Sequence, residues 1–109
     1  MSNNEFIDIL IKEYKRIYYE NKGMFYVPIY LLRQNVCKSM NITRKRFNNL
    51  LQELPNETDR YIISFTQPME RKAISKMINK KDKWYYYLRI YERAGWNTIN
   101  RDKIGIENN

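Results

Sequence analysis

The sequence predicts an α+β fold, because the spacing of its apolar residues is helical before Pro55 and alternating after residue 60. Apolar side chains that recur every three or four positions are typical of amphipathic helices, and alternation is typical of half-buried strands. The 109 residues are enough for one domain, and 43% apolar residues can fill its core without disulfides or metal. The predicted helices cover residues 4–21, 29–39 and 44–54, and the predicted strands cover residues 24–27, 60–67 and 83–91.

Local signals place the boundaries of the helices. The first helix carries apolar side chains at helical spacing from Phe6 to Tyr18. Pro28 ends the short first strand and suits the first turn of the next helix, because proline has no N–H to leave unpaired. Asn41 tolerates the left-handed backbone that a tight turn needs, and Thr43 is a favoured N-cap for the third helix. Two helices joined by this four-residue turn are typical of a helix-turn-helix.

The second half of the chain has the pattern of a long β-hairpin. Apolar side chains alternate along residues 60–67 and again along residues 83–91. The connection between these strands, residues 68–82, is basic, and its central part is either helical or an extension of the strands. We expect the domain to cover residues 1–96 and to be followed by a flexible polar tail at residues 97–109.

The positive charge of the chain lies in two segments. The net charge is +8, from 20 basic and 12 acidic residues. The first basic block, residues 33–46, holds five basic residues and no acidic one, whereas the second basic block, residues 71–83, holds six basic residues and Asp82. Each block therefore carries +5, and the rest of the chain carries a net charge of −2. Two such blocks in an otherwise slightly acidic chain favour a surface that binds polyanions.

One residue type on which many hydrolytic enzymes depend is missing. The chain has no histidine, and Cys37 is its one cysteine. Imidazole bases, Ser-His and Cys-His pairs and an intramolecular disulfide are therefore excluded, and we expect no enzymatic activity, no cofactor and no metal. Apolar runs are far shorter than the roughly 20 residues that span a bilayer, and residues 1–5 lack the basic start of a signal peptide. We expect a cytoplasmic protein that does not bind membranes.

The apolar sites, the turn and the hairpin follow one another in this order: Val27 to Ile29, Leu31 and Leu32, Val36 and Cys37, the turn Met40 to Thr43, then Phe47, Leu50 and Leu51, and the hairpin from Tyr61 to Tyr91. This order resembles that of the winged helix-turn-helix domains, which bind duplex DNA. The resemblance implies three helices followed by a two- to three-stranded antiparallel β-hairpin, the wing. Asn41 stands where glycine is frequent in the turn, and the connection over residues 68–82 makes the wing longer than a minimal one.

The resemblance also implies which side chains meet DNA. In such a domain the third helix, here residues 44–54, lies in the major groove. With the core face on Phe47 and Leu50, its opposite face carries side chains that suit guanine (lysine) and adenine (asparagine and glutamine). The candidates for base readout are Lys45, Asn48, Asn49 and Gln52. The candidates for phosphate contacts are Arg33, Lys38, Thr43, Arg44, Arg46, Arg71, Lys72, Lys76, Lys80, Lys81 and Lys83.

The predicted function is sequence-specific binding of double-stranded DNA, by a small transcriptional regulator or by a replication or segregation accessory factor associated with the nucleoid. A palindromic site would need a homodimer with twofold symmetry, joined through the first helix or the Tyr-rich strand. Asn, Ile, Lys and Tyr are abundant and have A/T-rich codons, which hints at a microbe or its mobile elements.

Two alternatives use the same features differently. A winged-helix adaptor could bind an acidic protein through the basic blocks. A binder of single-stranded DNA or RNA could stack bases on Tyr85, Tyr87 and Tyr91, which share one face of the last strand. A Tyr-rich strand more often packs against the rest of its own protein, so duplex binding is the preferred hypothesis.

Overall fold

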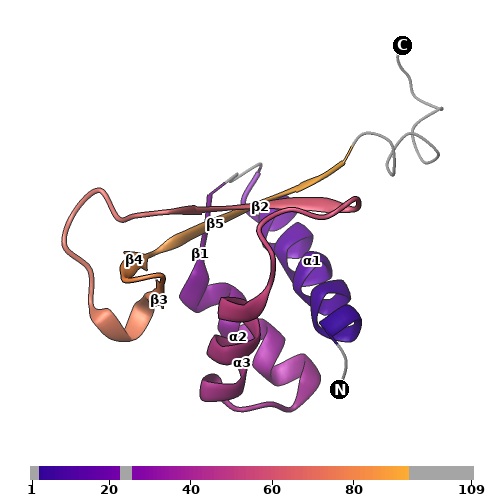
Figure 1. Ribbon diagram of the computed structural model, residues 1–109, viewed down its shortest axis with the longest axis horizontal. Coiled ribbons are helices and arrows are strands. Elements are labelled where there is room, and N and C mark those ends of the chain that lie inside the picture. Colours follow the sequence, from indigo (N-terminus) through magenta and orange to yellow (C-terminus); the bar gives the residue numbers. More distant parts are fainter. Residues whose placement is uncertain (1–2, 23–25, 94–109) are drawn as a thin grey trace, which may run out of the picture.

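The computed structural model describes residues 3–22 and 26–93, and within them the chain forms an α+β fold with three α-helices and antiparallel strands (Figure 1). The predicted tail at residues 97–109 lies outside the described residues. The helices are α1 (Asn3–Glu20), α2 (Ile29–Met40) and α3 (Arg44–Glu53), with a short 3-10 helix, η1 (Ile74–Lys76). The strands are β1 (Val27–Pro28), β2 (Tyr61–Thr66), β3 (Ile78–Lys80), β4 (Lys83–Tyr85) and β5 (Tyr87–Glu92).

The three helices agree closely with the predicted ranges, because their apolar spacing and end signals are local. Asn41 adopts the left-handed conformation that the turn was predicted to need, with φ 55° and ψ 50°, and its N–H donates to the carbonyl oxygen of Cys37. The hydroxyl oxygen of Thr43 accepts the backbone N–H of Arg46 at 3.0 Å, so Thr43 is the N-cap of α3. The turn between α2 and α3 is thus fastened at both ends.

A sheet in the order β1-β5-β2 forms one side of the described fold, with every neighbouring pair antiparallel. Tyr61 pairs with Glu92 at one end of the β2–β5 ribbon, and Thr66 pairs with Tyr87 at the other. In Figure 1 this ribbon extends along the upper part of the view and the helices are gathered below it. The first strand was predicted over residues 24–27; β1 lies at Val27–Pro28, and residues 24 and 25 lie outside the described part.

The prediction of one continuous strand over residues 83–91 is wrong, because this segment forms two strands, β4 and β5, on either side of Tyr86. The N–H of Tyr86 donates to Thr66 at 3.0 Å, while its carbonyl oxygen accepts the N–H of Ile29 at 2.8 Å. Tyr86 therefore bonds the first residue of α2, and the chain before it pairs with β3. Alternation continues through the change of partner, which is why the sequence pattern did not reveal it.

The sequence predicts either a helix or an extension of the strands in the connection over residues 68–82, and the connection contains both. It enters η1 and then makes a tight hairpin in which Lys80 pairs with Lys83. The two turn residues, Lys81 and Asp82, have φ of 54° and 67°, as the two-residue turns that match strand twist require. The β3–β4 hairpin folds back towards α3, where Gln52 donates its side-chain N–H to the carbonyl oxygen of Asn79 at 2.7 Å.

The core lies between α1, α2, α3 and the inner face of the sheet, and it holds the apolar residues that set the helical spacing. The rings of Phe6 and Phe47 pack edge to face with their centroids 5.7 Å apart. Charged side chains are also buried within the described chain, and these are Glu13, Arg33 and Lys80. Glu13 accepts hydrogen bonds from Arg16 and from the hydroxyl of Ser39, each at 3.2 Å, which compensates its burial.

No helix in residues 3–22 and 26–93 has the length and the apolar character needed to cross a membrane.

Candidate nucleic-acid interface

Helix α3 buries one face and exposes a polar one. Phe47, Leu50 and Leu51 are buried in the core, whereas Lys45 and Asn49 are exposed on the opposite side of the helix. The helical period explains this division, because positions 45 and 49 are one turn apart and lie away from the apolar stripe. Within the described chain, the side chains of Lys45 and Asn49 take part in none of the hydrogen bonds or ion pairs, so both can reach an external partner.

The other two base-readout candidates contact their own chain. The side-chain oxygen of Asn48 accepts a hydrogen bond from Arg33 at 3.2 Å. The side-chain amide of Gln52 donates a hydrogen bond to the carbonyl oxygen of Asn79. Of the four candidates, Lys45 and Asn49 are therefore the two whose polar atoms are directed away from the fold. An asparagine or glutamine that bonds its own protein looks the same in a sequence as one that does not.

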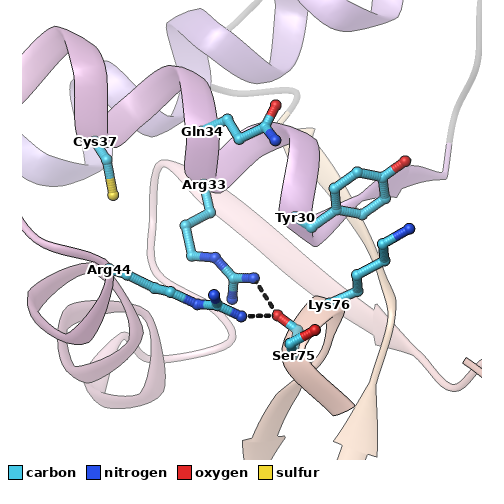
Figure 2. Close-up of a pocket in the computed structure, with 7 residues that line it drawn as sticks. All are labelled: Tyr30, Arg33, Gln34, Cys37, Arg44, Ser75 and Lys76. Carbon is cyan, nitrogen blue, oxygen red and sulfur yellow. Dashed lines mark hydrogen bonds between the residues drawn. The ribbon is translucent and has the colours of Figure 1, made fainter. Parts of the chain in front are cut away.

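Arg33 and Arg44 converge on a single backbone oxygen, the carbonyl of Ser75, as Figure 2 shows. Arg33 donates to this oxygen at 2.6 Å and is only 6% exposed. Burial is the main cause that lowers the pKa of Arg33, and the nearby charge of Arg44 lowers it further. The structure thus places Arg33, a candidate for phosphate contact at the surface, inside the junction between α2 and the η1 segment.

Lys80, another candidate for phosphate contact, is 9% exposed and bonds the end of α3. Its ammonium donates to the carbonyl oxygens of Gln52 at 2.9 Å and Leu54 at 3.1 Å. The last carbonyls of a helix lack partners within the helix and form the negative end of its dipole, so a lysine there stabilises them. Burial, followed by the charge of Lys81, lowers the pKa of Lys80.

The remaining cations of the two blocks stay accessible. Two of them lie over aromatic rings: the ammonium of Lys76 is 4.8 Å from the centroid of Tyr30, and that of Lys72 is 5.0 Å from the centroid of Tyr86. Thr43 is exposed but already serves as the N-cap of α3. Exposed or half-buried are Lys38, Arg44, Lys45, Arg46, Arg71, Lys72, Lys76, Lys81 and Lys83.

The ion pairs lie outside the two basic blocks that carry the net positive charge. Within residues 3–22 and 26–93, every ion pair takes its cation from Lys15, Arg16, Arg60 or Arg93. These four residues belong to α1 or flank the β2–β5 ribbon, and they bond acids such as Glu92. In the described chain no cation of either basic block has a carboxylate partner. The positive charge on α2, α3 and the connection is therefore not neutralised by carboxylates of residues 3–22 and 26–93.

A cleft of about 400 Å³ lies where these elements meet. Helix α2 forms one wall, the N-terminus of α3 a second, and η1 the third (Figure 2). No signal in the sequence points to Ser75 at its centre, because Ser75 contributes a backbone carbonyl and lies far from Arg33 and Arg44 in the chain. The residues that line the cleft are Tyr30, Arg33, Gln34, Cys37, Arg44, Ser75 and Lys76.

The tyrosines considered for base stacking pack against neighbours. The ring of Tyr85 lies 5.5 Å from that of Phe65, and the ring of Tyr87 lies 4.6 Å from that of Tyr86. Tyr91 is 39% exposed, but the guanidinium of Arg89 covers its ring at 4.3 Å. Because each ring already has a partner, this face offers less open ring surface for bases than the sequence suggested.

Among the described residues, no three acidic or cysteine side chains are grouped as a metal ion would require. Comparison of the chain with protein-family models, with curated proteins and with solved structures gives no match.

Proposed function

We propose that this protein is a winged-helix protein that binds double-stranded DNA, with α3 in the major groove and the β3–β4 hairpin and its flanking loop beside the backbone. The order of helices and strands supports this proposal, as does the sheet in which the short β1 lies beside β5. The observation that carries it is the absence, in the described chain, of carboxylate partners for the cations of both basic blocks. A phosphate backbone supplies the missing anions.

The part of α3 best suited to the groove runs from its N-terminus to Asn49. Lys45 can donate to guanine O6 and N7, and Asn49 can pair its amide with adenine N6 and N7. Arg46, which directly follows Lys45, is exposed and suits a contact with a phosphate. The acidic residue of this helix, Glu53, is at its other end, which keeps it away from the DNA in this orientation.

The connection completes the proposed interface, because its hairpin is bonded to α3. The bonds of Lys80 and Gln52 join β3 to the last turn of α3, and this contact places the exposed Lys81 and Lys83 in the hairpin beside the helix that we propose enters the groove. Arg71, before η1, extends the same basic connection. These cations make contacts that add affinity without base preference.

Such a protein would act as a small transcriptional regulator or as a replication or segregation factor on the nucleoid. Both roles need the same DNA contacts. A palindromic site would additionally require two copies of the chain, related by a twofold axis.

Competition at constant salt tests the proposal. A labelled duplex is bound first and then challenged with unlabelled duplex, with single-stranded DNA or with RNA of the same length. We expect the duplex to compete best. Six phosphate contacts would give a log-log salt slope of about −5, because each neutralised phosphate contributes about −0.9. Better competition by single strands or RNA, or a slope near zero, would reject duplex binding through these cations.

A further inference from the structure

Within the described part of the chain, Arg33 carries a buried charge without an anionic partner. The residue is 6% exposed, and both of its hydrogen-bond acceptors are neutral: the carbonyl oxygen of Ser75 at 2.6 Å and the side-chain oxygen of Asn48 at 3.2 Å. No carboxylate of the described chain forms an ion pair with it. Arginines this deeply buried are ordinarily paired with an anion, so the site is electrostatically incomplete as it stands.

A second guanidinium intensifies this positive charge. Arg44 donates to the same Ser75 oxygen, so two cations share one neutral acceptor. The two positive charges bond the same oxygen and repel one another, and this repulsion is part of what lowers the pKa of Arg33. Lys76 lies on the far rim of the same cleft, beside Tyr30 (Figure 2). The residues that line the cleft include three cations and no acid.

We propose that this cleft binds a phosphate monoester group, held by Arg33 and Arg44 on one side and by Lys76 on the other. A guanidinium matches the oxygens of a phosphate in both charge and geometry, and each arginine has N–H donors beyond the one that Ser75 accepts. Three cations suit a doubly charged monoester better than a carboxylate, which carries a single charge. The volume of about 400 Å³ leaves room for the group that bears the phosphate.

This inference goes beyond duplex binding and does not require it. The proposed base contacts of α3 use Lys45 and Asn49, which do not line the cleft. A phosphate monoester could come from a small phosphorylated molecule or from the 5′ end of a DNA strand. Both present the same group to the same cations, so the chemistry of the site is common to the two sources.

Thermal unfolding of the full chain in inorganic phosphate tests the proposal, with sodium chloride holding the ionic strength constant. We expect the midpoint temperature to rise saturably with phosphate, because a ligand that binds only the folded state stabilises it. Arg44→Gln and Lys76→Gln should each weaken the apparent affinity about tenfold, the size expected for one charge-assisted hydrogen bond. Lys12→Gln removes one exposed charge on α1, outside the cleft, and should leave the affinity unchanged.

The same unfolding measurements can overturn the proposal of a phosphate site. The absence of saturable stabilisation by phosphate, or an equal loss of affinity in Lys12→Gln, would overturn the proposal, because the effect would then come from total charge. Should Arg44→Gln unfold, Lys76→Gln still decides the matter, since the side chain of Lys76 is exposed and its substitution leaves the backbone bond of η1 in place.

Two further ligands distinguish the sources of the phosphate. Tighter binding of a 5′-phosphorylated duplex than of its 5′-hydroxyl counterpart would assign the DNA end, whereas competition by a nucleoside 5′-monophosphate with no end effect would assign a small molecule. The double variant Lys45→Ala/Asn49→Ala separates this site from the proposed DNA interface: it should lose duplex affinity and retain phosphate stabilisation.

Discussion

The ammonium of Lys80 lies 2.9 Å from the backbone oxygen of Gln52, at the C-terminal end of the helix that we propose enters the major groove. The same ammonium also bonds the carbonyl oxygen of Leu54, and Gln52 in turn bonds Asn79 beside Lys80. A lysine of the second basic block thus joins the β3–β4 hairpin to α3. Its charge stabilises the fold, and neighbouring lysines remain at the surface.

This relationship predicts a loss of stability when the Lys80 ammonium is removed. Lys80→Met keeps the alkyl chain and deletes the charge-assisted hydrogen bonds, which contribute roughly 1.5–3 kcal/mol. We expect the free energy of unfolding in urea to fall by about 2 kcal/mol. Lys81→Met, at the adjacent exposed position, is the control and should change stability by less than about 0.5 kcal/mol. Similar values for the two variants would contradict the role of Lys80 as a cap.

The proposed interface predicts different effects on affinity from two sets of residues. Lys45→Ala and Asn49→Ala should each cost about 1–3 kcal/mol on a preferred duplex, selected from a random pool, and should relax base preference. Lys81→Ala should weaken all duplexes alike and reduce the salt slope by about 1. Fluorescence anisotropy on selected and scrambled duplexes measures both. Equal losses on the two duplexes for all three variants would show that α3 does not read bases.

The N-cap of α3 predicts a stability effect that is separate from DNA binding. Thr43→Ala removes the hydroxyl that accepts the N–H of Arg46 at 3.0 Å, and loss of such a cap costs about 1 kcal/mol. Thr43→Ser retains the hydroxyl and should preserve most of the stability. Chemical denaturation of both variants gives the comparison, and an unstable serine variant would mean that the methyl group matters more than the cap.

The alkaline stability of the protein depends on its buried tyrosines. Burial raises the pKa of Tyr61 above its ordinary value, so the unfolded chain loses this proton first as the pH rises through about 10. The unfolded state then binds fewer protons than the folded one, and stability falls from that pH up to the raised pKa of the folded state. We expect Tyr61→Phe to lose less stability than the wild type as the pH rises above about 10. Tyr19→Phe, at a residue that is 71% exposed, should follow the wild type.

Much of the secondary structure could be predicted because its signals are local. Helical spacing from Phe6 onward, the left-handed Asn41 and the cap at Thr43 depend on residues within a few positions of one another, and the structure confirms each of them. The division of the last predicted strand at Tyr86 could not be predicted in this way. It depends on hydrogen bonds to Ile29 and Thr66, which are remote in sequence.

The sequence by itself determined that the positive charge lies in two blocks and that an amphipathic α3 presents a polar face. Only the tertiary structure decided which members of those blocks can meet a ligand. Arg33 is directed into the cleft, away from the surface that we propose meets DNA, by a bond to Ser75, 42 residues away, and Lys80 is withdrawn from the surface by a bond to Gln52, 28 residues away. Charge is a property of each residue alone, whereas burial and hydrogen bonding depend on segments that folding brings together, so the accessible cations were known only once those segments were in place.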